Sequence, residues 1–78
     1  MDIRDLEKGS QYQIQRDFYD FYHTPYTQGQ VLTFVELHFL PYHGGYTLVF
    51  QEKSLYLQEE DNSNILGSLK EYLRLVKK

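Results

Sequence analysis

The chain has 78 residues, of which 41% are hydrophobic and 24% charged, with eight Tyr, five Phe and no Cys. This composition is typical of one small globular domain over residues 1–78, and it excludes a disordered or collagen-like chain and a disulfide framework. The formal net charge is −3, and no Lys or Arg occurs between Asp17 and Glu52. We therefore expect no nucleic-acid partner and no anionic membrane partner, because both are bound through cations.

The sequence also bears on the cellular location of the protein. No uninterrupted apolar run approaches the ~18 residues of a membrane-spanning helix. Residues 1–9 alternate charges, where a secretory signal has a basic start and an apolar stretch. These two observations predict a cytoplasmic protein.

The N-terminal part predicts a cap followed by a strand. In residues 1–9, Ile3 and Leu6 are spaced by three and Gly9 can end a helical turn. From residue 11 to residue 18, Tyr12 and Ile14 alternate with Gln side chains, which is the period of a strand with one wet face.

Residues 17–30 break this alternation. The segment repeats DFY, contains Pro25 and ends near Gly29, and this pattern predicts a long aromatic loop or an irregular hairpin. A loop of about a dozen residues is unusual in so small a domain and is often functional.

Three more strands are predicted after this loop, over residues 30–40, 46–51 and 55–58. The first of them is apolar on both faces at its start, so we expect a central, bent strand that buries different faces at its two ends. Gly44 and Gly45 predict a tight hairpin before the second strand.

The C-terminal segment predicts a helix over residues 62–77. Polar residues precede it, and apolar residues then recur at helical spacing at Ile65, Leu66, Leu69, Tyr72, Leu73 and Val76. Together with the strands, this helix is expected to close one core that contains Ile14, Phe34, Leu48, Phe50, Leu57, Leu69 and Leu73.

The predicted fold class is α+β, with an antiparallel sheet over residues 10–60 and one C-terminal α-helix. A small Src-homology-3-like β-barrel fits this order of elements, with the helix over an open end or an edge. A strongly bent, open meander sheet with the helix across one face fits it as well.

Four stretches of the sequence, LEKGSQYQI, GQVLTFVE, PYHGGYTLVF and LYLQEED, resemble a small bacterial domain family of unknown function. The double glycine with its flanking aromatic residues is the most specific part of this resemblance. The family brings no activity with it, so the resemblance implies no mechanism and no site residues.

The aromatic residues of the loop and of the glycine turn suggest a binding surface. Tyr supplies rigid contact area with a polar tip, and acids beside such rings favour a basic or proline-rich segment. The candidate binding residues are Asp17, Tyr19, Asp20, Tyr22, Tyr26 and Tyr42. The alternative interpretation is that these rings fill the core of a domain short of large aliphatic residues.

Catalysis is the competing functional hypothesis. Glu36 and His38 lie two apart on a predicted strand and therefore share a face, and His43 follows in the glycine turn. A small hydrolase or a metal-dependent enzyme would use these three residues. However, the sequence contains neither a nucleophile motif nor a phosphate-binding glycine loop, and its three His residues have no metal-site spacing.

The sequence therefore predicts a non-enzymatic protein-interaction domain without a metal or another cofactor. Its partner is expected to be an extended peptide segment of another protein, or a second copy of the chain, bound through the aromatic and acidic loop.

Overall fold

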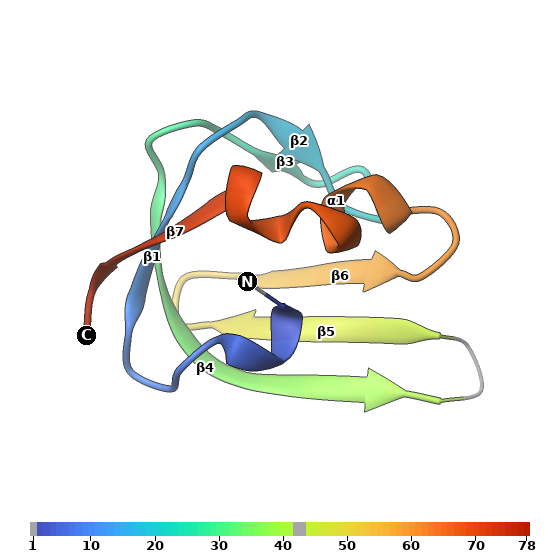
Figure 1. The fold of residues 1–78 in the computed structure, drawn as a ribbon, viewed down its shortest axis with the longest axis horizontal. Coiled ribbons are helices and arrows are strands. Elements are labelled where there is room, and N and C mark those ends of the chain that lie inside the picture. Colours follow the sequence, from blue (N-terminus) through green and yellow to red (C-terminus); the bar gives the residue numbers. More distant parts are fainter. Residues whose placement is uncertain (1, 42–43) are drawn as a thin grey trace.

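The structure is a computed structural model that describes residues 2–41 and 44–78. Its elements, in chain order, are η1 (Ile3–Asp5), β1 (Gln11–Ile14), β2 (Phe18–Tyr19), β3 (Pro25–Tyr26), β4 (Val31–Leu40), β5 (Gly45–Phe50), β6 (Ser54–Gln58), α1 (Ser63–Gly67), η2 (Leu69–Glu71) and β7 (Leu73–Lys77). Five strands form one antiparallel sheet in the order β6-β5-β4-β1-β7, and β2 and β3 form a separate two-stranded hairpin (Figure 1).

Strand β4 is the central strand, and it is bent as the sequence predicted. Its first half pairs with β1 and its second half with β5, and the register shifts between Phe34 and Glu36. Because one extra residue reverses which side chains point inward, Phe34 is buried before the shift and Leu37 packs on the core after it. The bend turns the sheet around its core, so that β1 and β7 run across β5 and β6 (Figure 1).

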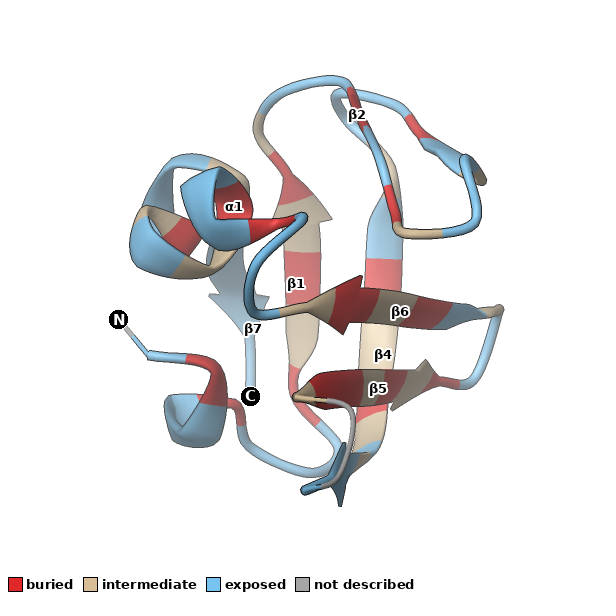
Figure 2. Ribbon diagram, turned by 90° about the vertical axis from the view of Figure 1, so that its right-hand side faces the viewer, coloured by how far each residue is buried: buried red, intermediate tan, exposed pale blue. Residues whose placement is uncertain are grey.

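The sheet does not close into a barrel. Among the described residues, no ladder joins β6 to β7, and the short helical segments α1 and η2 lie between these two strands in sequence and in space (Figures 1 and 2). The Src-homology-3-like barrel expected above is therefore wrong, and the strongly bent antiparallel sheet is the observed arrangement.

The predicted C-terminal helix over residues 62–77 is also wrong. Only the single turns α1 and η2 are helical, with Ser68 between them in a non-helical conformation. Residues 73–77 form β7, which pairs antiparallel with β1. The apolar spacing of this segment also suits a strand from Leu73 onward, and the exposed edge of β1 supplies the hydrogen-bonding partner that the segment extends to meet.

The predicted core is confirmed. All seven residues expected in it belong to one buried cluster, to which the rings of Tyr12, Phe18 and Tyr26 also belong. On β5 and β6, buried and partly exposed residues alternate as expected of strands with one face on the core (Figure 2).

The N-terminal segment begins with a single 3-10 turn in the residues that the structure describes. Asp2 caps the turn η1 through its side chain, and Ile3 and Leu6 are buried. Gly9 has a φ of +86°, which L side chains rarely adopt. Within residues 2–41 and 44–78, no helix is long and apolar enough to cross a membrane.

Candidate functional site

The aromatic loop is held in place by a buried carboxylate. Asp20 is only 4% exposed, and its Oδ1 accepts hydrogen bonds from the backbone N–H groups of Tyr22 and Thr24, both at 2.9 Å. Its Oδ2 accepts a third bond, at 3.3 Å, from the N–H of Tyr56 on β6. Because a buried carboxylate needs such donors, Asp20 fixes both the shape of the loop and its position against the sheet.

Two rings of the loop face inward. Phe18 and Tyr26 stack with ring centroids 5.1 Å apart, and the edge of Tyr72 packs on Phe18. The Tyr26 hydroxyl donates to the Ser54 carbonyl at 2.7 Å. Burial raises the pKa of Tyr26 far above its ordinary value because a buried phenolate loses its hydration, and the charge of Asp20 adds to this effect.

Other rings of the loop face outward. Tyr22 is 69% exposed, yet its ring stacks on that of Tyr56 at 5.1 Å with an interplanar angle of 26°. Phe21 meets both rings edge-on, at 5.3 Å from Tyr22 and 5.6 Å from Tyr56. The Phe21 N–H also donates to the Tyr56 carbonyl at 2.8 Å, so the loop is bonded to β6 through backbone and side chains.

The register of the sheet extends this aromatic group across three strands. His38 of β4 lies opposite Thr47 of β5, which in turn lies opposite Tyr56 of β6. Directly opposite residues of neighbouring strands share a face, so these three side chains form one row. A Cβ at Gly45 would collide with the Tyr56 hydroxyl, which shows that the hydroxyl end of the Tyr56 ring lies against this glycine.

We call this surface the outer face, because it lies on the side of the sheet away from the core. It is composed of Phe21, Tyr22, Glu36, His38, Thr47 and Tyr56.

The predicted acids of the site lie elsewhere. Asp20 is buried, and its oxygens are engaged by backbone donors. Asp17 is exposed, but its Oδ1 accepts a hydrogen bond from the Gln28 N–H at 2.7 Å and so shapes the base of the loop. The acid that shares a face with the exposed rings is Glu36, which the sequence placed in the catalytic hypothesis.

The predicted tyrosines divide into two groups. Tyr26 is 1% exposed and fills the core, as the core-filling interpretation predicts for it. Tyr22 and Tyr19 are exposed, but the Tyr19 ring neighbours His23, with centroids 6.2 Å apart, rather than the outer face. Tyr42 lies outside the described residues.

The residues of the catalytic hypothesis are partly brought together. His38 Nε2 lies 2.9 Å from Glu36 Oε1, and both side chains are more than half exposed. Such exposed pairs are ordinary surface features. His43 lies outside the described residues, and the part of the chain that the structure describes holds no group of three or more His, Cys, Asp or Glu residues able to bind a metal ion.

Two hollows accompany these features. One of about 260 Å³ lies beside the loop and is lined by Asp20, Phe21, His23, Asp61 and Asn62. The other, of about 280 Å³, is lined by Asp2, Ile3, Tyr46, Glu59, Ser63, Leu66 and Gly67. In the second hollow, the Tyr46 hydroxyl donates to Glu59 Oε1 at 2.7 Å, and this bond is the main reason why the pKa of Tyr46 is raised.

Three residues of the outer face belong to neither sequence-based site: Phe21, Thr47 and Tyr56. Tyr56 is the one on which the Tyr22 ring stacks. The alternation of its strand already placed it outward, but nothing in the sequence indicated that it would receive Tyr22. That contact depends on the loop docking on β6, which is a long-range event.

The chain is similar in structure to an integron cassette protein from the mobile metagenome of Vibrio cholerae. The TM-score is 0.85 at 26% sequence identity, over 91% of this chain and 88% of that one. No family model and no curated protein matches the chain. These findings agree with the expectation of a family to which no function is assigned.

Proposed function

We propose that the protein is a non-enzymatic interaction domain that holds an extended segment of a partner protein across the outer face. The observation that carries the proposal is the Tyr22 ring, which is exposed and yet fixed by its stack on Tyr56. Tyr is favoured at binding surfaces because its ring provides a large contact area at low cost in conformational entropy.

The fixed position of Tyr22 supports this role. Its backbone N–H is bonded to buried Asp20, and the neighbouring Phe21 is bonded to β6. A partner that binds a ring already held in place loses little further conformational entropy. The row from β4 to β6 spans two interstrand spacings, about 10 Å, which roughly three residues of an extended segment would cross.

The charge near the outer face favours a basic or proline-rich segment. Glu36 lies at one end of the face, and Asp61 lines the hollow beside Phe21 at the other. The segment from Asp17 to Glu52 contains most of the residues of this surface, and it contains no Lys or Arg. An acidic segment would meet these carboxylates, and the outer face itself contains no Lys or Arg to balance them.

Immobilised peptides of about a dozen residues test this proposal. One set is rich in Arg and Pro, and a matched set replaces each Arg with Glu. We expect the wild-type chain to bind members of the first set, and Tyr22→Ser to weaken this binding at least about tenfold, as removal of a central aromatic anchor does.

Tyr19→Ser is the matched control, because it removes an equally exposed ring outside the outer face. It should bind within about twofold of wild type, and both variants should keep their unfolding free energy within about 1 kcal/mol, as surface substitutions usually do. Equal loss in the two variants, or equal binding of both peptide sets, would contradict the proposal. Self-association of the wild type that is lost in Tyr22→Ser would assign the face to a second copy of the chain.

A further inference from the structure

The two edges of the five-stranded sheet differ in how their backbone groups are satisfied. On the β6 edge, groups that point away from β5 are bonded by the loop and by Asn62. Gln58 N–H donates to Asn62 Oδ1 and Gln58 C=O accepts from Asn62 N–H, both at 2.9 Å. Together with the bonds to Ser54 and Tyr56 described above, these contacts cover β6 along its length.

Strand β7 has β1 on one side and no second strand beside it among residues 2–41 and 44–78. Just after β1, the Gln15 N–H donates to the Tyr72 carbonyl at 2.8 Å. Tyr72 therefore bonds toward β1, and in an antiparallel ladder every second residue after it does the same. Arg74 therefore bonds toward β1, whereas Leu73 and Leu75 direct their N–H and C=O groups to the open side. A row of backbone groups of this kind is a template for another strand.

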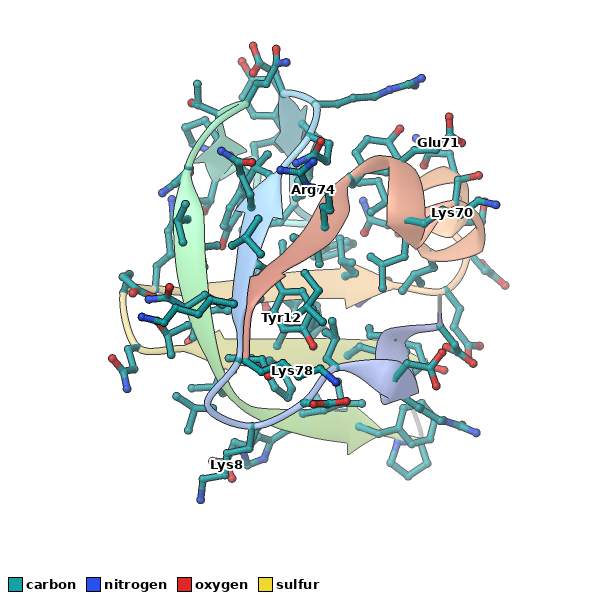
Figure 3. The ribbon with its side chains drawn as sticks, turned by 60° about the vertical axis from the view of Figure 1, so that its left-hand side comes forward. Lys8, Tyr12, Lys70, Glu71, Arg74 and Lys78 are labelled. Atoms are coloured by element: carbon teal, nitrogen blue, oxygen red, sulfur yellow. The ribbon has the colours of Figure 1, made fainter. Side chains whose placement is uncertain are left out.

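The open strand combines apolar and cationic side chains. Leu75 is 39% exposed and Val76 is 40% exposed. Basic residues lie on β7, just before it and at its end: Lys70, Arg74, Lys77 and Lys78, of which Lys70, Arg74 and Lys78 are labelled in Figure 3. Glu71, the acidic residue labelled in the same view, already pairs with Arg16 at 3.1 Å.

From these observations we propose that the open edge of β7 takes up an extended acidic segment of a partner protein as an additional antiparallel or parallel strand. Main-chain hydrogen bonds to Leu73 and Leu75 would provide the register. Acidic side chains of the segment would meet Arg74, Lys77 and Lys78, and its apolar side chains would cover Leu75.

Charge also decides against a second copy of the chain as the occupant. Two β7 strands paired edge to edge would lie about 5 Å apart. Each would bring Arg74, Lys77 and Lys78, so that six cations would gather on one short ladder. Like charges across neighbouring strands are destabilising, whereas an acidic segment neutralises the same groups.

The first experiment titrates the full-length, ¹⁵N-labelled chain with a capped seven-residue peptide that alternates Glu and Val. We expect the amide signals of Leu73, Leu75 and Lys77 to shift, and the Leu75 amide to exchange more slowly with solvent. The same peptide with alternate backbone nitrogens methylated, and a peptide that alternates Lys and Val, should each bind at least about tenfold more weakly, because one lacks ladder donors and the other has the wrong charge.

Two variants of the chain locate the site. The double variant Lys77→Glu, Lys78→Glu should weaken binding of the Glu–Val peptide at least about tenfold. Leu75→Pro removes an N–H that points to the open side and not to β1, so it should abolish binding with the β1–β7 ladder retained. If Leu75→Pro does not fold, the methylated peptide answers the same question on the wild-type chain.

Tyr22→Ser separates this proposal from the one for the outer face. It should leave binding of the Glu–Val peptide unchanged, because Tyr22 packs on β6 at the opposite edge of the sheet. The proposal is overturned if the Glu–Val peptide does not bind, if the methylated peptide binds equally well, if the shifts gather on the outer face, or if the wild type dimerises through β7.

Discussion

The two edge strands of the sheet invite comparison, because the chain treats them in opposite ways. On β6, a buried carboxylate, a tyrosine hydroxyl, a backbone amide and an asparagine side chain bond the outward-pointing backbone groups. On β7, the corresponding groups of Leu73 and Leu75 face the open side, where the side chains of Leu75 and Val76 are exposed.

The residues that cover the β6 edge also form part of the outer face. The loop that protects β6 also carries Tyr22, and its hydrogen bonds to β6 are what hold the exposed ring still. The edge of β7 has no such cover among the described residues, and it carries Lys and Arg side chains, which on an edge strand disfavour pairing with a second copy of the same strand.

The largest expected effect comes from removing the anchor of the covered edge. Asp20→Ala leaves the N–H groups of Tyr22, Thr24 and Tyr56 without their acceptor, and we expect a loss of about 3 kcal/mol in unfolding free energy. Urea denaturation measures it. Asp17→Ala, which removes one surface acceptor, is the control and should cost less than about 1 kcal/mol. Similar losses in the two variants would mean that the loop does not depend on Asp20.

The next largest effect on stability is expected at Gly45, against which the Tyr56 hydroxyl packs. Gly45→Ala places a methyl group against the Tyr56 hydroxyl, so the ring must move and we expect a loss of about 1–3 kcal/mol. In Gly67→Ala, the new methyl group meets nothing within 4 Å, and the change should stay within about 1 kcal/mol of wild type. Thermal unfolding of both variants makes the comparison, and an unaffected Gly45→Ala would show that the ring does not rest on this glycine.

A third prediction concerns the Tyr26 hydroxyl, which donates a hydrogen bond to the Ser54 carbonyl. Tyr26→Phe should lose about 1 kcal/mol at neutral pH, because one buried hydrogen bond is removed. Burial raises the pKa of Tyr26 in the folded state, so the stability that its protonated form contributes is fully present below the ordinary tyrosine value, about pH 10. This stability is lost as the pH rises above that value.

Urea unfolding between pH 7 and pH 11 measures this dependence. Tyr26→Phe should show a smaller alkaline loss of stability than wild type, whereas Tyr19→Phe, which alters an exposed ring, should keep the wild-type profile. If the unfolding free energy depended on pH in the same way in all three proteins, Tyr26 would not be the titrating group.

The smallest effect is expected at the open edge. Val76→Thr should change the unfolding free energy by less than about 0.5 kcal/mol, because the side chain is exposed and its shape is kept. Hydrogen exchange in the wild type sharpens the contrast: the Leu75 amide should exchange at least about tenfold faster than the Tyr56 amide, which is bonded to Asp20. Equal protection of both amides would show that β7 is covered in solution.

Much of the sheet could be predicted from local patterns. The alternation in residues 46–51 and 55–58 identified the inward side chains, and the two apolar faces of residues 30–40 indicated the bend that the register shift at Phe34 produces. The candidate site was harder. Sequence analysis grouped Tyr22 with Asp20 and Tyr26 as candidate binding residues and left core filling open for the rings. Tyr22 is exposed, whereas Asp20 and Tyr26 are buried because the loop folds onto β6.

Local sequence patterns were sufficient for the strands with a clear period of two and for the seven residues expected in the core. These properties follow from spacing along the chain, since each side chain's direction depends on its neighbours in sequence. The conformation of residues 73–77 depends on long-range contacts, because their apolar spacing suits helix and strand alike. Pairing with β1 selected the strand, because the backbone of an edge strand gains hydrogen bonds there that local propensity does not anticipate. The same kind of long-range contact, between the loop and β6, decided which aromatic rings became core and which remained on the surface.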